Sequence, residues 1–224
     1  MKEHVFFDLD HTLWDFEQNS EACLRSIHAE LLAKEVDFAN FSATFRRINK
    51  ALWRALEQNS ITHDELRQRR FKESLEELQL TCTVEASLAM NEEFMRLLPQ
   101  QTQLMDGSLE VLDYLGGKYQ LHIISNGYLD IQTRKMQGSG LLPYFKHIIT
   151  SDIAGSRKPD PQIFDYALEA AGTHREKAIY IGDDEVADKE GAEKAGMPFI
   201  WYAPHREERN TKQINALYQL MEIL

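Results

Sequence analysis

A single short strand stands apart from the other strands of this chain, and the long stretch that separates them is helical in pattern. Residues 4–9 (HVFFDL) are a brief apolar run, which indicates a buried strand. Residues 16–99 carry apolar side chains at helical spacing and contain no convincing strand. From residue 106 onward strands and helices alternate, which is typical of a parallel sheet covered on both faces. We therefore predict an α/β fold with a doubly wound sheet (residues 1–15 and 100–224) and a helical insert (residues 16–99).

The apolar spacing predicts four helices in the insert. Thr62 and Glu65 form a capping-box pattern at the start of the third helix, and Pro99 ends the fourth. The apolar positions of the four helices are Leu24, Ile27 and Leu31; Phe41, Phe45, Ile48 and Leu52; Phe71, Leu75 and Leu78; and Leu88, Met95 and Leu98. The later strands are expected at 119–125, 147–151, 178–184 and 198–202, and the later helices at 108–115, 129–138, 161–171, 186–195 and 211–224.

Charge and composition exclude some classes of function. The net charge of −11 disfavours binding to nucleic-acid polymers or to membrane surfaces. No apolar run is long enough to span a bilayer, and the N-terminus is too short and too acidic for a signal peptide. Cys23 and Cys82 lie outside any CxxC pair, so we expect reduced, buried thiols. The sequence thus favours a cytoplasmic monomer or homodimer that acts on a small molecule.

Polar residues follow each predicted strand that can be placed. In an open α/β sheet, ligands bind outside the carboxyl ends of the strands, so these residues are expected at one edge. Each group by itself is an ordinary turn or helix cap, but their joint occurrence in this order indicates a site. The groups are Asp8, Asp10, His11 and Thr12; Ser125, Asn126 and Gly127; Lys158 and Pro159; and Gly182, Asp183, Asp184 and Asp188.

These residue types meet the needs of phosphate monoester cleavage. A carboxylate such as Asp8 can form an aspartyl-phosphate, and a second one, Asp10, can donate and accept the proton. The two alternate along an extended strand, so their side chains start on one face. The hydroxyl of Ser125, the ammonium of Lys158 and backbone N–H groups near Asn126 and Gly127 can compensate the phosphate charge. Because carboxylates repel phosphate, the site also requires a hard cation such as Mg²⁺, with Mn²⁺ as an alternative.

These motifs resemble the haloacid dehalogenase superfamily. Its four motifs correspond in order to DxDxT at residues 8–12, the apolar run that ends in Ser125 and Asn126, Lys158-Pro159, and GDx₄D at residues 182–188. The resemblance implies a Rossmann-like core with a helical cap inserted after the first strand.

The resemblance also implies roles for individual residues. Asp8 would be the nucleophile and a metal ligand, and Asp10 the general acid/base that also gives its backbone carbonyl to the metal. Thr12 would steady the loop, and Ser125 and Lys158 would bind the phosphoryl group. Asp183 would be a metal ligand with Asp184 and Asp188 close by, although Asp184 stands where many relatives have Ser or Thr.

Within the superfamily, three stretches resemble the pyrimidine 5′-nucleotidase group. They are residues 51–71 (ALWRALEQNSITHDELRQRRF), 158–172 and 201–208 (WYAPHREE). Asp10 and the acidic fourth motif argue against the metal-free dehalogenases. The alternatives that stay open are a sugar or sugar-acid phosphatase such as phosphoglycolate phosphatase, a phosphomutase, and a non-enzymatic phospho-aspartate receiver.

A cap that closes over the core could exclude water and select the substrate. Trp14, Phe16, Trp53 and Arg67 could reach a base or a sugar, although Trp53 is better explained as a core residue and Arg67 as part of a solvated face. We expect Arg70 and Phe71 to face the substrate.

Overall fold

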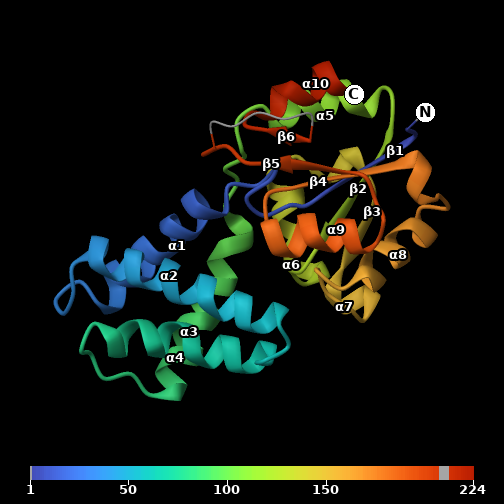
Figure 1. Cartoon of the computed structure of the whole chain (residues 1–224). Coiled ribbons are helices and arrows are strands. Elements are labelled where there is room, and N and C mark those ends of the chain that lie inside the picture. Colours follow the sequence, from blue (N-terminus) through green and yellow to red (C-terminus); the bar gives the residue numbers. More distant parts are fainter. Residues whose placement is uncertain (1, 207–211) are drawn as a thin grey trace. The chain divides into compact units, whose positions relative to one another are not determined.

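The chain divides into two compact units in the computed structural model, which describes residues 2–206 and 212–224 (Figure 1). One unit comprises Met1–Phe16 with Thr102–Leu224 and contains the sheet. The other comprises Glu17–Gln101 and is helical. We refer to them as the α/β unit and the helical unit.

The α/β unit is built on a parallel sheet in the order β3-β2-β1-β4-β5-β6, which confirms the predicted fold class. The N-terminal strand lies in the middle, with β2 on one side and β4 on the other. The chain fills one side first and then returns to the other, so the order reverses between β1 and β4, and ligands of such sheets bind at this reversal. The strands are β1 (His4–Phe7), β2 (Gln120–Ser125), β3 (Phe145–Thr150), β4 (Ala178–Gly182), β5 (Phe199–Tyr202) and β6 (Gln213–Ile214).

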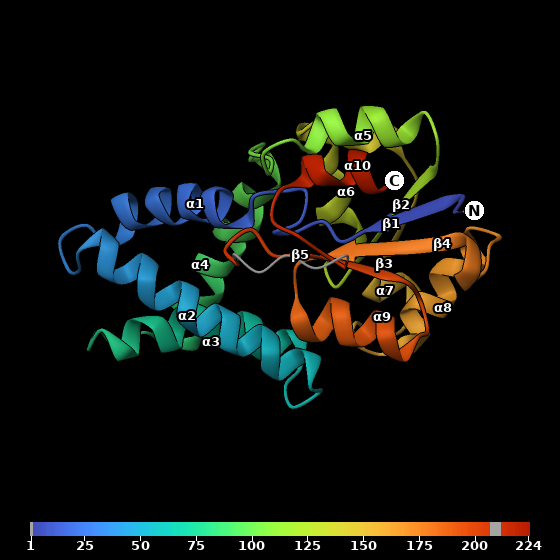
Figure 2. The same cartoon turned by 45° about the horizontal axis from the view of Figure 1, so that its top comes forward.

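Helices cover both faces of this sheet. Figure 2 shows α5 and α10 on one face and α8 and α9 on the other. Beneath α8 and α9, side chains from the central strands form a buried core in which the rings of Phe164 and Tyr180 meet edge to face at 5.2 Å. The helices of this unit are α5 (Ser108–Gly116), α6 (Leu129–Gly138), α7 (Ser151–Ala154), α8 (Pro161–Ala170), α9 (Gly191–Lys194) and α10 (Leu220–Ile223).

The helical unit has its own apolar core. The rings of Phe41, Phe45, Phe71 and Phe94, from three different helices, pack together with centroid separations of 4.8 to 6.5 Å. Thr62 and Glu65 form the expected capping box at the start of α3. The four helices are α1 (Phe16–Leu31), α2 (Phe38–Glu57), α3 (His63–Glu77) and α4 (Val84–Leu97).

Two predicted apolar faces in the helical unit are shifted. Leu31 is exposed and Leu32 is buried in its place. On α4 the buried positions include Ser87 and Asn91. Ser87 can be buried because its hydroxyl donates to the Gln68 carbonyl and accepts from the Lys72 N–H group.

The C-terminal region departs most from the prediction. The expected helix 186–195 is a π-helical segment, Glu185–Glu190, followed by α9. The expected helix 211–224 is instead the short strand β6, a 3-10 turn and the four-residue α10. Residue 211 of that helix, and residues 207 and 208 of the stretch 201–208, lie outside the described residues.

Within the described residues, every helix is too short or too polar to cross a membrane. Cys23 and Cys82 are both buried, and neither forms a disulfide.

Candidate active site

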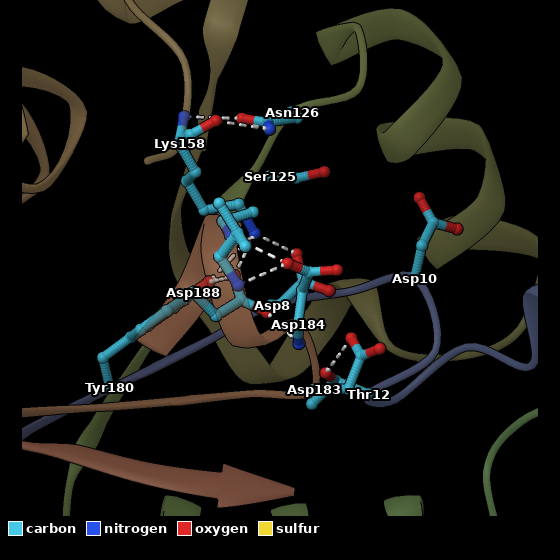
Figure 3. Close-up of polar contacts among 12 residues, drawn as sticks. Asp8, Asp10, Thr12, Ser125, Asn126, Lys158, Tyr180, Asp183, Asp184 and Asp188 are labelled. Carbon is cyan, nitrogen blue, oxygen red and sulfur yellow. Dashed lines mark hydrogen bonds and ion pairs between the residues drawn. The ribbon is translucent and has the colours of Figure 1, made fainter. Parts of the chain in front are cut away.

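The carboxyl ends of β1, β2 and β4 bring the predicted polar groups to one edge of the sheet, at the reversal of strand order (Figure 3). β1 ends at Phe7 and not at residue 9, so Asp8 already belongs to the following turn. The backbone N–H of Asp8 still donates to the Ile181 carbonyl at 2.8 Å, which keeps this residue beside β4.

Three carboxylates converge at this edge. One oxygen each from Asp8, Asp183 and Asp188 lies within 4.8 Å of the others. Burial raises the pKa of Asp8, and Asp188 adds to this effect while Lys158 opposes it. Burial, together with Asp188 and Asp8, also raises the pKa of Asp183. Three carboxylates this close, of which Asp8 and Asp188 are buried and Asp183 is half-buried, require a cation. Oxygen ligands of this kind suit a hard divalent ion.

Lys158 is the buried cation that belongs to the chain itself. Its ammonium donates to Asp8 Oδ1 at 2.5 Å, to Asp188 Oδ1 at 2.7 Å and to the Tyr180 hydroxyl at 3.0 Å. The Tyr180 hydroxyl donates in turn to Asp188 Oδ1 at 2.6 Å. Burial disfavours the ammonium form, but Asp188 and Asp8 outweigh burial and raise the pKa of Lys158. This network holds Asp8, the candidate nucleophile, beside Asp188, a candidate metal ligand.

A tight turn after β1 places Thr12 against β4. Its hydroxyl donates to Asp183 Oδ1 at 3.2 Å. His11, between Asp10 and Thr12, has a φ of 66°, a left-handed conformation that costs a non-glycine residue about 1 kcal/mol or more. Asp183 is thus held at two points: Thr12 contacts its side chain, and the indole N–H of Trp201 donates to its carbonyl at 2.8 Å.

Asp184 caps a helix and lies outside the carboxylate group formed by Asp8, Asp183 and Asp188. Its side chain accepts from the N–H groups of Val186 and Ala187 at 2.8 and 2.7 Å, at the start of the π-helical segment. Its own N–H donates to Asp188 Oδ2 at 2.9 Å. Gly182 makes this arrangement possible, because a Cβ at that position would lie 2.4 Å from Asp188 Oδ2.

The groups after β2 are held by contacts within the site. The Asn126 side chain brackets Lys158: Oδ1 accepts from the Lys158 N–H at 2.8 Å, and Nδ2 donates to its carbonyl at 3.0 Å (Figure 3). The Gly127 N–H donates to Ser125 Oγ at 3.1 Å. In this structure the Gly127 N–H therefore contacts Ser125, and the side chain of Asn126 positions the lysine loop.

Asp10 stands apart from the three carboxylates (Figure 3) and is held by α6. Lys135 Nζ donates to its Oδ1 at 2.7 Å and Gln132 Nε2 to its Oδ2 at 2.8 Å. Burial raises the pKa of Asp10, but Lys135 and Gln132 outweigh burial and keep the pKa below its usual range. The Lys135 ammonium also lies 4.4 Å from the centroid of the Trp14 ring, and Trp14 is fully buried.

The two cap residues expected to face substrate are buried in the helical unit. Phe71 is wholly enclosed by Phe45 and its neighbours, because an apolar ring on the inner face of α3 is most stable there. Arg70 lies with its guanidinium 4.7 Å from the Phe94 ring, and burial lowers its pKa to about 9. The expectation for Phe71 is thus wrong, and Arg70 is a buried residue of the same core.

Sequence reasoning missed Tyr180, Gln132 and Lys135. Tyr180 lies inside an apolar strand, where its ring resembles any core side chain. Gln132 and Lys135 share a helix face with the buried Ile131 and Met136. Polar residues on the face that helical spacing assigns to the core were the available signal.

Comparisons with known proteins agree with this geometry. Residues 2–196 match the haloacid dehalogenase-like hydrolase family. The chain is 34% identical over 212 residues to the pyrimidine 5′-nucleotidase PynA of Streptococcus pneumoniae, covering 93% of this chain and 86% of that protein. It is 30% identical over 226 residues to the pyrimidine 5′-nucleotidase YjjG of Escherichia coli, covering 98% and 96%.

A solved structure extends the likeness to three dimensions. YfnB of Bacillus subtilis, in a crystal form bound to magnesium that reveals interdomain movement, superposes with a TM-score of 0.91 at 29% sequence identity. The match covers 100% of this chain and 98% of that one.

Proposed function

Because this chain belongs to the haloacid dehalogenase-like hydrolases, we propose that it is a magnesium-dependent phosphatase whose substrates are pyrimidine nucleoside 5′-monophosphates. The observation that carries the proposal is the convergence of Asp8, Asp183 and Asp188 within 4.8 Å, directly beside the buried Lys158. The named activity of PynA and YjjG supports the choice of substrate.

The residues present fit a divalent ion. The ligand atoms on offer are carboxylate oxygens, which Mg²⁺ prefers. The three converging carboxylates and the Lys158 ammonium leave two negative charges, which one divalent ion would neutralise. Asp8, Asp183 and Asp188 would hold the ion. The charge of the ion would allow a phosphate to approach the carboxylates and would polarise the phosphate oxygens. Magnesium bound to YfnB is consistent with this choice.

The chain's own residues supply the remaining chemistry. An oxygen of Asp8 forms a bond to phosphorus as the bond from phosphorus to the ester oxygen breaks, giving an aspartyl-phosphate. Asp10 takes up a proton from solvent on its exposed side and gives it to the departing oxygen. It later takes a proton from the attacking water, whose oxygen bonds to phosphorus as the bond from phosphorus to Asp8 breaks. The Ser125 hydroxyl and Lys158 bind the phosphoryl oxygens.

We assign the choice of substrate to the helical unit. The α/β unit offers groups for a phosphate and a metal, so the contacts that distinguish one monoester from another are left to the inserted unit. The interdomain movement described for YfnB supports a role as a lid that excludes water during the reaction.

A substrate panel tests the proposal. The protein is incubated with nucleoside and sugar monophosphates, with Mg²⁺ or with a chelator, and released phosphate is measured. We expect thymidine and deoxyuridine monophosphates to rank highest and the chelator to abolish turnover. A clear preference for sugar phosphates would leave the phosphatase in place and remove the nucleotidase assignment.

Asp8→Asn tests the nucleophile. Because an amide cannot form the acyl-phosphate, we expect turnover of every substrate to fall by about 10⁴-fold or more. Asp130→Asn is the matched control, since the Asp130 side chain is 73% exposed and pairs only at the surface with Arg134. Turnover by Asp8→Asn close to that of Asp130→Asn would rule out the covalent mechanism.

A further inference from the structure

Helix α6 turns two buried polar side chains toward Asp10. Gln132 and Lys135 are 1% and 3% exposed and stand three residues apart, so they share one helix face. Each gives one hydrogen bond to a different oxygen of Asp10, at 2.8 and 2.7 Å. The Asp10 carboxylate is therefore fixed at both of its oxygens by a single helix.

Burying the charged side chain of Lys135 destabilises the protein unless another group compensates the charge. Burial of an ammonium is strongly unfavourable, and an ion pair with good geometry can offset the loss of hydration. Asp10 is its carboxylate partner, and its remaining surroundings include the rings of Trp14 at 4.4 Å and Phe16 at 5.7 Å. Asp10 itself keeps a side chain that is 25% exposed, so the pair is closed on the lysine side and open on the carboxylate side.

Gln132 links Asp10 to the phosphate-binding segment. The same Nε2 that donates to Asp10 also donates to Ser125 Oγ at 2.7 Å. Gly127 leaves room for this amide, because a Cβ there would lie 2.7 Å from Gln132 Nε2. One amide thus sets the distance between the acid/base candidate and the hydroxyl that would bind the phosphoryl group.

We propose that Gln132 and Lys135 are positioning residues that aim the Asp10 carboxyl group at the leaving oxygen of the substrate. The inference rests on the proposed phosphatase function. Each donor occupies one lone pair of an Asp10 oxygen, which leaves acceptor capacity for the transferred proton. Asp10 takes up a proton from solvent on its exposed side and passes it to the ester oxygen as the phosphorus–ester bond breaks. Neither Gln132 nor Lys135 exchanges a proton with the substrate.

The dependence of kcat/KM on the leaving group distinguishes this positioning role from a purely structural one. A poor leaving group such as phenolate or a nucleoside alkoxide needs the proton, whereas 4-nitrophenolate departs without it. If Asp10 is misplaced, kcat/KM for phenyl phosphate should fall by about 100-fold, and that for 4-nitrophenyl phosphate by less than about threefold. The KM values should change little when Lys135 is replaced, because Ser125 and Lys158 then keep their contacts.

The variant to measure is Lys135→Met, which keeps the length of the side chain and removes its charge. Lys135→Arg retains the charge and should restore much of the ratio of the two kcat/KM values. Arg134→Met is the matched control: it removes a cation from the neighbouring position of α6, where the side chain is 53% exposed and does not contact Asp10. Both substrates are measured on one sample, so partial unfolding lowers both rates equally and leaves their ratio intact.

Gln132→Met provides an independent variant should Lys135→Met fail to fold. It removes the donor to Asp10 Oδ2 and also the donor to Ser125 Oγ. We expect a loss shared by both substrates from the change at Ser125, and a further loss with phenyl phosphate alone from the change at Asp10. A fall of equal size for both substrates, or an unchanged ratio in both variants, would overturn the inference. If the wild-type protein hydrolysed neither ester, the proposed function would fail first, and that result is separate from the behaviour of the variants.

Discussion

Gly182 shows how closely single residues are packed around the site. Its missing Cβ would lie 2.4 Å from Asp188 Oδ2 and 2.8 Å from Asp188 Cβ. Asp188 cannot move aside freely, because Lys158, Tyr180 and the Asp184 N–H all hold it. We therefore expect Gly182→Ala to lower the free energy of unfolding by about 1–3 kcal/mol, as overpacking does, and to weaken Mg²⁺ binding. Thermal melts with and without Mg²⁺ measure both effects.

Gly116→Ala is the control for that substitution. A Cβ at Gly116 would meet only Leu121 Cδ1 at 3.9 Å, an ordinary contact. Alanine at the end of α5 should be neutral or stabilise the protein by up to about 1 kcal/mol. Equal melting temperatures for the two variants would show that Asp188 is free to move.

Across the strands, a row of stacked imidazoles makes the sheet sensitive to acid. His122 on β2 is fully buried, lies 4.5 Å from the Phe6 ring and accepts or donates a hydrogen bond with His4 at 3.0 Å. His147 on β3 stacks on its other side at 5.3 Å. Burial, with added repulsion from His4, His147 and Lys146, lowers the pKa of His122 to about 3. Burial also lowers the pKa of His4, against the attraction of Glu3.

The sign of the resulting pH dependence follows from proton uptake. An unfolded chain protonates this ring below about pH 6.5, whereas the folded chain keeps it neutral down to about pH 3. Stability from this residue is therefore complete above pH 6.5 and falls by about 1.4 kcal/mol per pH unit as the pH drops through that window. In His122→Phe the loss of unfolding free energy between pH 7 and pH 4.5 should shrink by about 2 kcal/mol. Urea unfolding at the two pH values measures it.

His174→Phe serves as the reference for the acid response. The side chain of His174 is 61% exposed and lies 4.0 Å from Glu176 at the surface. Its replacement removes one surface imidazole and leaves the buried stack of His4, His122 and His147 in place. The same acid sensitivity in both variants would mean that the buried stack does not control it.

The strands and helices also show what could be predicted from the sequence. The central strands were predictable because apolar runs such as 178–182 end in polar turns, and the rule for parallel sheets places those turns at one edge. β6 has only two residues, Gln213 and Ile214, and no pattern of its own. The π-helical segment was not predictable from the sequence. Asp184 caps it while Asp188 reaches back to the Gly182 backbone, and both contacts exist only in the folded site. Tyr180, Gln132 and Lys135 find their partners only through tertiary contacts.

At the scale of the whole molecule, two cores are joined by only two chain connections, near residues 16 and 101. Phe45 belongs to the aromatic core of the helical unit, and Phe164 to the core of the α/β unit. Each unit can therefore lose stability without the other, and the simple two-state description need not hold. Only the α/β unit carries the carboxylates Asp8, Asp183 and Asp188, so bound Mg²⁺ should stabilise that unit alone.

Phe45→Ala and Phe164→Ala form a matched pair for this prediction. Each removes a fully buried ring, which costs about 3–5 kcal/mol. Calorimetry of Phe45→Ala should resolve an early transition that Mg²⁺ does not move and a later one that Mg²⁺ raises. In Phe164→Ala the order should reverse, because the early transition is now that of the unit that binds the ion. A single transition that both substitutions lower alike, and that Mg²⁺ raises in both, would show that the two cores unfold together and that the helical unit has no stability of its own.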